Sequence, residues 1–97
     1  MSLFRPDIPP HVAEVIRSLH PDLKRSIKSA IRVIAADPEC GESLQRELNG
    51  LRKYRVRRFR IVYATDQKAR VIRLMAIGHR RYVYEELTEQ LRRKGRE

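Results

Sequence analysis

The chain has 97 residues, with 22 Lys and Arg against 12 Asp and Glu, so its formal net charge is +10. This length suits a single domain spanning residues 1–97, and the one cysteine, Cys40, excludes an internal disulfide and a cysteine-based zinc site within one chain. The charge opposes compaction and favours an anionic partner, and composition alone does not choose among nucleic acid, an anionic membrane and an acidic protein.

Neither a membrane span nor a signal peptide is predicted. No apolar run approaches the roughly 20 residues that a membrane-spanning helix needs. The N-terminal stretch MSLFRPDIPP also lacks the apolar centre of a signal peptide. We therefore expect a cytoplasmic protein without a membrane partner.

Two amphipathic helices are predicted after the stretch SLFR, which is at most a short strand because prolines follow it. The first helix has apolar residues at i, i+3, i+4 and i+7, namely Val12, Val15, Ile16 and Leu19. Pro21 ends this helix and suits the first turn of a second one. The second helix ends near Asp37-Pro38, and its apolar stripe consists of Leu23, Ile27, Ala30, Ile31 and Ile34. Together they form a helical hairpin.

The pattern changes to the period of β-strands after a loop and the turn signal Asn49-Gly50. Hydrophobic and basic residues alternate from Lys53 to Tyr63, and a third strand runs from Arg70 to Ile77, where Gly78 ends it. Helical spacing returns at Val83, Tyr84, Leu87 and Leu91. This order predicts an α+β domain: an N-terminal helical hairpin, a small antiparallel β-sheet and a C-terminal helix, with the helices against one face of the sheet.

A two-residue turn at Arg57-Arg58 gives the first two strands a self-consistent pairing, with Val56 opposite Phe59 and Arg55 opposite Arg60. Because side chains alternate between faces, one face would be the core face, with Tyr54, Val56, Phe59, Ile61 and Tyr63. The other face would carry Lys53, Arg55 and Arg60. Arg73 of the third strand joins that basic face if Ile72, Leu74 and Ala76 point into the core.

The basic face has two interpretations. It is a solvated polar surface, or it binds an anion. Arg55 opposite Arg60 is an unfavourable like-charge pair, and no acidic residue occurs between Arg52 and Asp66. An anionic ligand would relieve this repulsion, and the planar fork of arginine suits phosphate oxygens. We therefore favour a site for nucleic-acid phosphates.

Three stretches resemble the RelE/ParE superfamily of bacterial toxins: LQRELNGLRKY, RVRRFRIVYATD and VIRLMAIGHRRYVYEEL. The resemblance covers about Leu44 to Leu87, and its matching residues are Leu48, Gly50, Leu51, Arg55, Val56, Phe59, Arg60, Ile61, Val62, Tyr63, Gly78, His79, Arg80 and Tyr84. Many relatives carry glycine in the hairpin turn, where this chain has Arg57. The turn must therefore tolerate side chains, or one residue must adopt a positive φ angle.

The resemblance implies the toxin of a toxin–antitoxin pair, with a cognate antitoxin as partner. RelE-like members cut mRNA on the ribosome without a metal or other cofactor, through attack of the 2′-hydroxyl on the adjacent phosphate. ParE-like members instead poison DNA gyrase and are not nucleases. An inactive, binding-only member is a third alternative, and we favour the mRNA endoribonuclease.

The resemblance to RelE also implies roles for individual residues. Arg60 and Arg80 would stabilise the phosphate, and Tyr84 would serve in acid–base chemistry or stacking. Lys53 and Arg55 would position RNA or assist proton transfer. Four more arginines complete the expected RNA-binding set: Arg57 and Arg58 of the turn, Arg73 of the third strand through its place on the basic face, and Arg81 next to Arg80. His79 is a candidate for proton transfer because the ordinary pKa of histidine lies near neutrality.

Simpler structural roles stand beside these functional ones. Tyr84 shares a helical stripe with Leu87 and would then serve only in core packing. A histidine after a strand is often structural, and Arg81 is an ordinary solvated residue in the simpler interpretation. The other two histidines, His11 and His20, lie near predicted helix ends and are interpreted as surface or capping residues. Cys40 is not expected to be a nucleophile.

Overall fold

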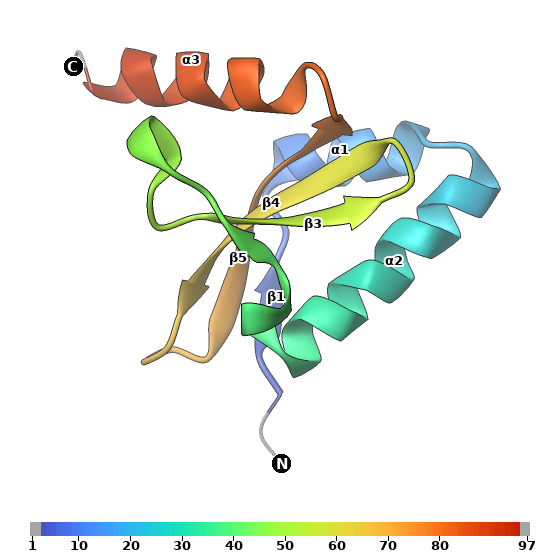
Figure 1. The fold of residues 1–97 in the computed structure, drawn as a ribbon. Coiled ribbons are helices and arrows are strands. Elements are labelled where there is room, and N and C mark those ends of the chain that lie inside the picture. Colours follow the sequence, from blue (N-terminus) through green and yellow to red (C-terminus); the bar gives the residue numbers. More distant parts are fainter. Residues whose placement is uncertain (1–2, 96–97) are drawn as a thin grey trace.

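The computed structural model describes residues 3–95. Three α-helices and five β-strands form its regular structure (Figure 1), in the order β1 (Arg5–Asp7), α1 (Pro10–Ser18), α2 (Pro21–Ala36), β2 (Glu42–Ser43), β3 (Arg52–Val56), β4 (Phe59–Asp66), β5 (Val71–His79) and α3 (Val83–Gly95). Short 3-10 turns occupy Pro38–Cys40 and Arg46–Leu48. The predicted α+β class with an N-terminal helical hairpin and a C-terminal helix is therefore confirmed.

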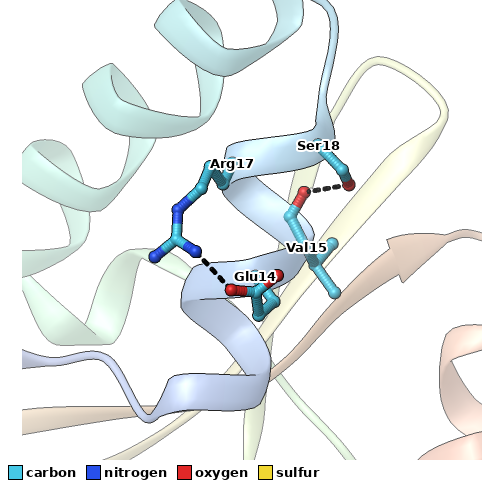
Figure 2. A network of polar contacts seen from close by, with 4 residues as sticks. All are labelled: Glu14, Val15, Arg17 and Ser18. Atoms are coloured by element: carbon cyan, nitrogen blue, oxygen red, sulfur yellow. Dashed lines mark hydrogen bonds and ion pairs between the residues drawn. The ribbon is translucent and has the colours of Figure 1, made fainter.

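The helical hairpin packs on one face of the sheet through the predicted stripes. Val12 and Ile16 of α1 and Ile27 and Ile34 of α2 are buried in the main core. Each helix begins with a proline at its first turn, where the missing N–H group costs nothing. On the exposed side of α1, Arg17 pairs with Glu14 and the Ser18 hydroxyl donates a hydrogen bond of 2.9 Å to the Val15 carbonyl (Figure 2). These surface contacts leave the apolar side of α1 free to pack.

The sheet is mixed, which corrects the prediction of a purely antiparallel one. Its strand order is β1-β5-β4-β3-β2, and β1 pairs with β5 in parallel. The stretch around Pro6 forms a strand despite its proline because it lies at the sheet edge, where one side of the strand needs no donors. Backbone bonds from Arg5 N to Arg70 O (2.8 Å) and from Phe4 N to Ala35 O (3.0 Å) fix this edge.

The C-terminal helix covers the opposite face of the sheet from the hairpin, which corrects the prediction that the helices share one face. Val83 and Leu87 of α3 are buried in a second core cluster with Leu48 and Val62. Val62 follows Ile61, which belongs to the main core, and neighbouring strand residues point to opposite faces. Figure 1 shows α3 on the far side of the strands from α2. The sheet is therefore the middle layer of a three-layer domain.

A register irregularity in β5 changes which of its side chains face the main core. Tyr63 pairs with Leu74, whereas Val62 pairs with Ala76, so Met75 is an extra residue on β5. Leu74 lies in the main core and Ala76 packs against the second cluster. The prediction that Ala76 shares the face of Leu74 is therefore wrong, because strict alternation does not extend across a bulge.

The prediction that Gly78 ends the third strand is wrong, because β5 continues to His79. A Cβ atom at Gly78 would lie 3.3 Å from the Cβ of Val83. The missing side chain thus lets the first residue of α3 pack closely on the strand. This close approach places the start of α3 beside the end of β5.

A buried tyrosine holds the loop after α2 against the sheet. The Tyr63 hydroxyl donates a hydrogen bond of 2.6 Å to the Pro38 carbonyl and accepts one of 3.1 Å from the Gly41 N–H group. A Cβ atom at Gly41 would lie 2.5 Å from this hydroxyl oxygen, so the contact requires glycine. Burial raises the pKa of Tyr63 to about 12, because the charged phenolate would lose its hydration.

Candidate nucleic-acid interface

The hairpin of β3 and β4 has the register that the sequence predicts. Val56 pairs with Phe59 and Arg55 pairs with Arg60, so the two chain positions between the strands are Arg57 and Arg58. Arg55 and Arg60 therefore lie on the same face of the sheet, next to each other on adjacent strands. Lys53, opposite Val62, shares that face. The basic face predicted from alternation is thus present.

The hairpin turn contains backbone strain at an arginine. Arg57 has a φ angle of +56°, in the left-handed region that L-residues other than glycine rarely adopt. Of the two alternatives that the sequence left open for this turn, the structure therefore has a residue with a positive φ angle. The side chain of Arg60 folds back to the turn, and its Nη1 donates to the carbonyls of Arg57 (3.2 Å) and Phe59 (2.8 Å). Arg60 thereby carries its charge at the turn.

The end of β5 is tied to the same turn. The Arg80 backbone N–H group donates a bond of 2.8 Å to the Arg58 carbonyl. Around this link lies a surface pocket of about 410 Å³, lined by Arg58, His79, Arg80, Arg81 and Tyr82. In this way residues more than twenty positions apart in the sequence come together at one end of the sheet.

The arginines of this end lack acidic partners. Within residues 3–95 no carboxylate forms an ion pair with the group that we call the arginine end, which comprises Arg55, Arg57, Arg58, Arg60, Arg80 and Arg81. All but Arg60 are exposed. Like charges gathered without counter-charges repel one another, and the surface therefore favours an anion.

Arg73 lies elsewhere, although it was predicted as part of the RNA-binding set. Arg73 pairs with Ala64 of β4 and precedes Gly78 by five residues along β5. At the rise of a strand, this separates Arg73 from the arginine end by roughly 15 Å. Its guanidinium contacts the carboxylates of Asp7 and Asp66, both at 3.7 Å. These acids balance the charge of Arg73, whereas the arginine end has none.

Lys53 and Tyr84 form a separate pair where α3 crosses the basic face. The Lys53 Nζ lies 6.0 Å from the centre of the Tyr84 ring and 3.6 Å from a carboxylate oxygen of Glu42. Tyr84 packs against the second core cluster, and its hydroxyl is buried without a hydrogen-bond partner in the described part of the chain. The packing role considered for Tyr84 is therefore present in the structure.

Tyr82 was not singled out from the sequence, yet it lines the pocket of the arginine end. Its side chain is 58% exposed, and its ring lies 5.9 Å from that of His79. A signal existed in the sequence: Tyr82 directly follows two arginines and falls outside the apolar stripe that begins at Val83. An aromatic residue outside the core stripe and beside cations is a candidate for ligand contact.

The remaining candidates stay outside this site. His11 contacts the Met75 carbonyl at 3.2 Å, beside the bulge in β5. Desolvation of the thiol and then the charge of Asp37 raise the pKa of Cys40, which disfavours the reactive thiolate. Among the described residues, no helix is both long and apolar enough to cross a membrane, and no three side chains of His, Cys, Asp or Glu gather as a metal site would require.

A protein-family comparison identifies the chain. The family described as "ParE-like toxin of type II bacterial toxin-antitoxin system" matches residues 8–88, which include both the helical hairpin and the whole arginine end. The chain belongs to the ParE-like toxin family. It is accordingly a toxin of the RelE/ParE type. No curated protein sequence is significantly similar to this ParE-like toxin.

Solved structures with the same fold come from bacteria and an archaeon. The RelBE2 toxin–antitoxin complex of Mycobacterium tuberculosis contains a chain with a TM-score of 0.75 at 20% identity, covering 82% of this chain and 94% of that one. A mutant of the Escherichia coli toxin RelE in the free state gives 0.75 at 17% identity, with 92% and 98% covered. The RelE–RelB complex of Pyrococcus horikoshii gives 0.67 at 19%, with 81% and 97% covered. At these identities the likeness shows the fold of this ParE-like toxin.

Proposed function

We propose that this toxin is an mRNA endoribonuclease that acts on the ribosome without a metal ion and so inhibits translation. The observation that carries the proposal is the arginine end, in which six arginines gather without an acidic partner among residues 3–95. The fold likeness to RelE toxins agrees with this proposal.

The proposed reaction transfers a phosphoryl group from the 5′-oxygen of one nucleotide to the 2′-oxygen of the nucleotide before it. The 2′-oxygen attacks the adjacent phosphorus, the bond from phosphorus to the 5′-oxygen breaks, and a cyclic phosphate and a 5′-hydroxyl result. Negative charge develops on the phosphorane oxygens, and fixed cations lower the barrier by stabilising it. Arg60, held at the turn by two carbonyls, and Arg80, linked to Arg58, are the proposed phosphate ligands.

Proton transfer requires a base for the 2′-hydroxyl and an acid for the leaving oxygen. Arginine does not lose its proton in proteins and cannot be this base. His79 lies in the pocket with Arg80 and is half-buried, so we assign it to proton transfer. The Tyr84 hydroxyl is buried, and a role in proton transfer requires that it become accessible when RNA binds.

The other basic residues would hold the RNA in place. Arg55, Arg57, Arg58 and Arg81 are exposed around the two phosphate ligands and suit contacts to neighbouring phosphates. Lys53 lies farther along the basic face, next to Tyr84, and would contact the RNA beyond the cleavage point. We leave Arg73 out of this set, because it lies toward the other end of the sheet and contacts the carboxylates of both Asp7 and Asp66.

A second candidate function is inhibition of DNA gyrase. The matching family is named for ParE. In the RelE/ParE superfamily that this sequence resembles, ParE-like toxins poison gyrase without cutting RNA. The arginine end would then contact the gyrase–DNA complex. We also propose a cognate antitoxin that neutralises the toxin, since the family belongs to type II toxin–antitoxin systems and similar toxins occur in complexes with RelB-type partners. An acidic antitoxin would complement the net charge of +10.

A cell-free translation reaction separates the two candidates. Primer extension on the translated mRNA should show new 5′ ends within the reading frame when the toxin is added, and none when translation is blocked beforehand. Intact mRNA, together with gyrase-dependent cleavage of supercoiled DNA, would contradict the endoribonuclease and establish the second candidate.

A further inference from the structure

Tyr82 lies at the outer end of a row of three rings. The Phe59 and His79 ring centres are 6.2 Å apart with an angle of 72° between the planes, and the His79 and Tyr82 centres are 5.9 Å apart with an angle of 39°. Phe59 packs against the main core, which anchors the row at its inner end. The Tyr82 backbone N–H group donates 2.9 Å to the His79 carbonyl. Tyr82 is thus held in a defined place although the residue is 58% exposed.

The surroundings of this ring are cationic. Arg58, Arg80 and Arg81 line the same pocket as Tyr82, and none of them pairs with a carboxylate of residues 3–95. The other large hydrophobic residues that are exposed in the described chain are Leu3, Ile8 and Val33, which are aliphatic and offer no flat ring. A flat exposed ring beside several arginines combines the two elements that single-stranded nucleic acids require, a stacking surface and phosphate ligands.

We propose that Tyr82 stacks on an unpaired nucleobase of the bound strand, whose phosphates contact Arg58, Arg80 and Arg81. This inference rests on the proposed function for the identity of the strand as RNA, and it adds a base-binding position to that site. A base within a duplex is already stacked on both faces and is not available to the ring. The Tyr82 contact therefore makes the site selective for single strands.

The test measures binding of a fluorescently labelled single-stranded RNA of twelve nucleotides to the full chain by anisotropy. Loss of one base–aromatic stack costs about 1–3 kcal/mol, so Tyr82→Ala should raise Kd by about 5- to 150-fold. Tyr82→Phe, which keeps the ring, should bind within about twofold of the unaltered chain. Val33→Ala serves as the matched control for loss of an exposed apolar side chain and should not change Kd. Circular dichroism melts verify that each variant is folded.

Salt dependence separates stacking from charge. Tyr82→Ala should leave the slope of log Kd against log salt unchanged, whereas Arg80→Ala should reduce it by about 0.7 for the loss of one phosphate contact to a single strand. Binding of a duplex RNA of the same sequence should not respond to Tyr82→Ala. An equal loss on duplex and single strand, or an unchanged Kd on the single strand, would overturn the proposal.

This result is independent of the cleavage assay. If Tyr82→Ala weakens single-strand binding although the toxin cuts no mRNA, the stacking position stands and the endoribonuclease fails. If the toxin cuts mRNA and Tyr82→Ala binds RNA normally, the endoribonuclease stands and the stacking position fails. A single-stranded DNA of the same sequence shows whether the sugar is read: Tyr82 dependence on both strands supports stacking on the base alone. Weakened binding of an acidic antitoxin with unchanged RNA binding would assign Tyr82 to the protein partner and overturn the proposal.

Discussion

At the scale of single residues, the candidate site contains conformations and groups that do not favour folding. Arg57 has a positive φ angle, and its neighbours in the turn and on β5 repel it. The Tyr84 hydroxyl is buried without a partner in the described chain. Each of these features costs stability, and strained or unsatisfied groups often occur where function requires them. Two substitutions measure these costs directly.

The strain at Arg57 predicts that Arg57→Gly stabilises the toxin. A left-handed conformation costs a residue with a side chain about 1–2 kcal/mol, which glycine would avoid. Glycine also gives the unfolded chain more conformational freedom, and this offsets about 0.4–1 kcal/mol of the stabilisation. We expect the free energy of unfolding in urea to rise by about 0.5–1 kcal/mol. Arg58→Gly, at a position without positive φ, is the control for charge loss and should destabilise. A loss of stability in Arg57→Gly equal to that in Arg58→Gly would contradict the strain.

The buried hydroxyl predicts that Tyr84→Phe is stabilising. Removing an unsatisfied polar atom recovers its desolvation cost, about 1 kcal/mol, and the ring retains its packing against the second core cluster and its place near Lys53. Thermal unfolding should show a higher midpoint for the variant. A lower midpoint would mean that the hydroxyl is bonded in the folded toxin. If cleavage of mRNA falls while stability rises, Tyr84 acts in proton transfer, and if cleavage is unchanged its role is packing.

At the scale of elements, the bond from Tyr63 of β4 to the loop at Pro38 and Gly41 connects the helical hairpin with the sheet. The neutral phenol is the form that the fold stabilises, because burial raises its pKa to about 12 from the ordinary value of 10. A group whose pKa is higher in the folded chain contributes its full stability below the unfolded pKa. That contribution is then lost as pH rises through the folded pKa.

This shift predicts alkaline destabilisation with a specific origin. Between pH 10 and 12 the toxin should lose roughly 2–3 kcal/mol through Tyr63. Tyr63→Phe should be less stable at neutral pH, since the Gly41 N–H and Pro38 carbonyl groups lose their partner. The difference between the two proteins, measured by urea unfolding, should narrow from pH 9 to pH 12. A constant difference over this range would contradict the shifted pKa.

The elements also show what the sequence can and cannot predict. The helices and the β3–β4 register were predictable, because each has a repeating apolar pattern that one register satisfies. The parallel strand β1 was not, since three exposed residues around Pro6 show no pattern. The bulge at Met75 shifted Ala76 to the other face without any local signal. The position of α3 was missed because its apolar stripe fits either face, and only the buried Val62 indicates the second layer.

In the site too, features set by a local repeating pattern were predictable, and features set by contacts between distant elements were not. The shared face of Arg55 and Arg60 follows from the period of a strand, so it was predictable. The separation of Arg73 was not, because its partners Asp7 and Asp66 come from β1 and the end of β4. The link between Arg80 and the turn depends on a pairing across strands β4 and β5. Tyr82 was not predicted as a site residue because the apolar stripe of the last helix begins one residue later, at Val83.

At the scale of the whole molecule, the net charge of +10 is unevenly distributed along the sheet. Where β4 ends and β5 begins, carboxylates contact Arg73. At the opposite end of the sheet, the arginines of the hairpin turn and of the end of β5 have no acidic partner among residues 3–95. The core on both faces of the sheet supplies the stability against which this repulsion is maintained. The toxin therefore presents one strongly cationic end of its sheet, and this is the end at which we propose that RNA binds.

The most direct test of this account is primer extension on mRNA translated with the unaltered toxin, Arg60→Ala and Arg73→Ala. Both variants lose one arginine from the same face of the sheet, and only Arg60 belongs to the arginine end. We predict that Arg60→Ala lowers the cleavage rate by about 100- to 1,000-fold, as loss of one charge-stabilising donor does, with an intact thermal transition, and that Arg73→Ala cleaves within about twofold of the unaltered toxin. Equal cleavage by both variants, or equal loss in both, would contradict the assignment of the arginine end as the RNA-cleaving site.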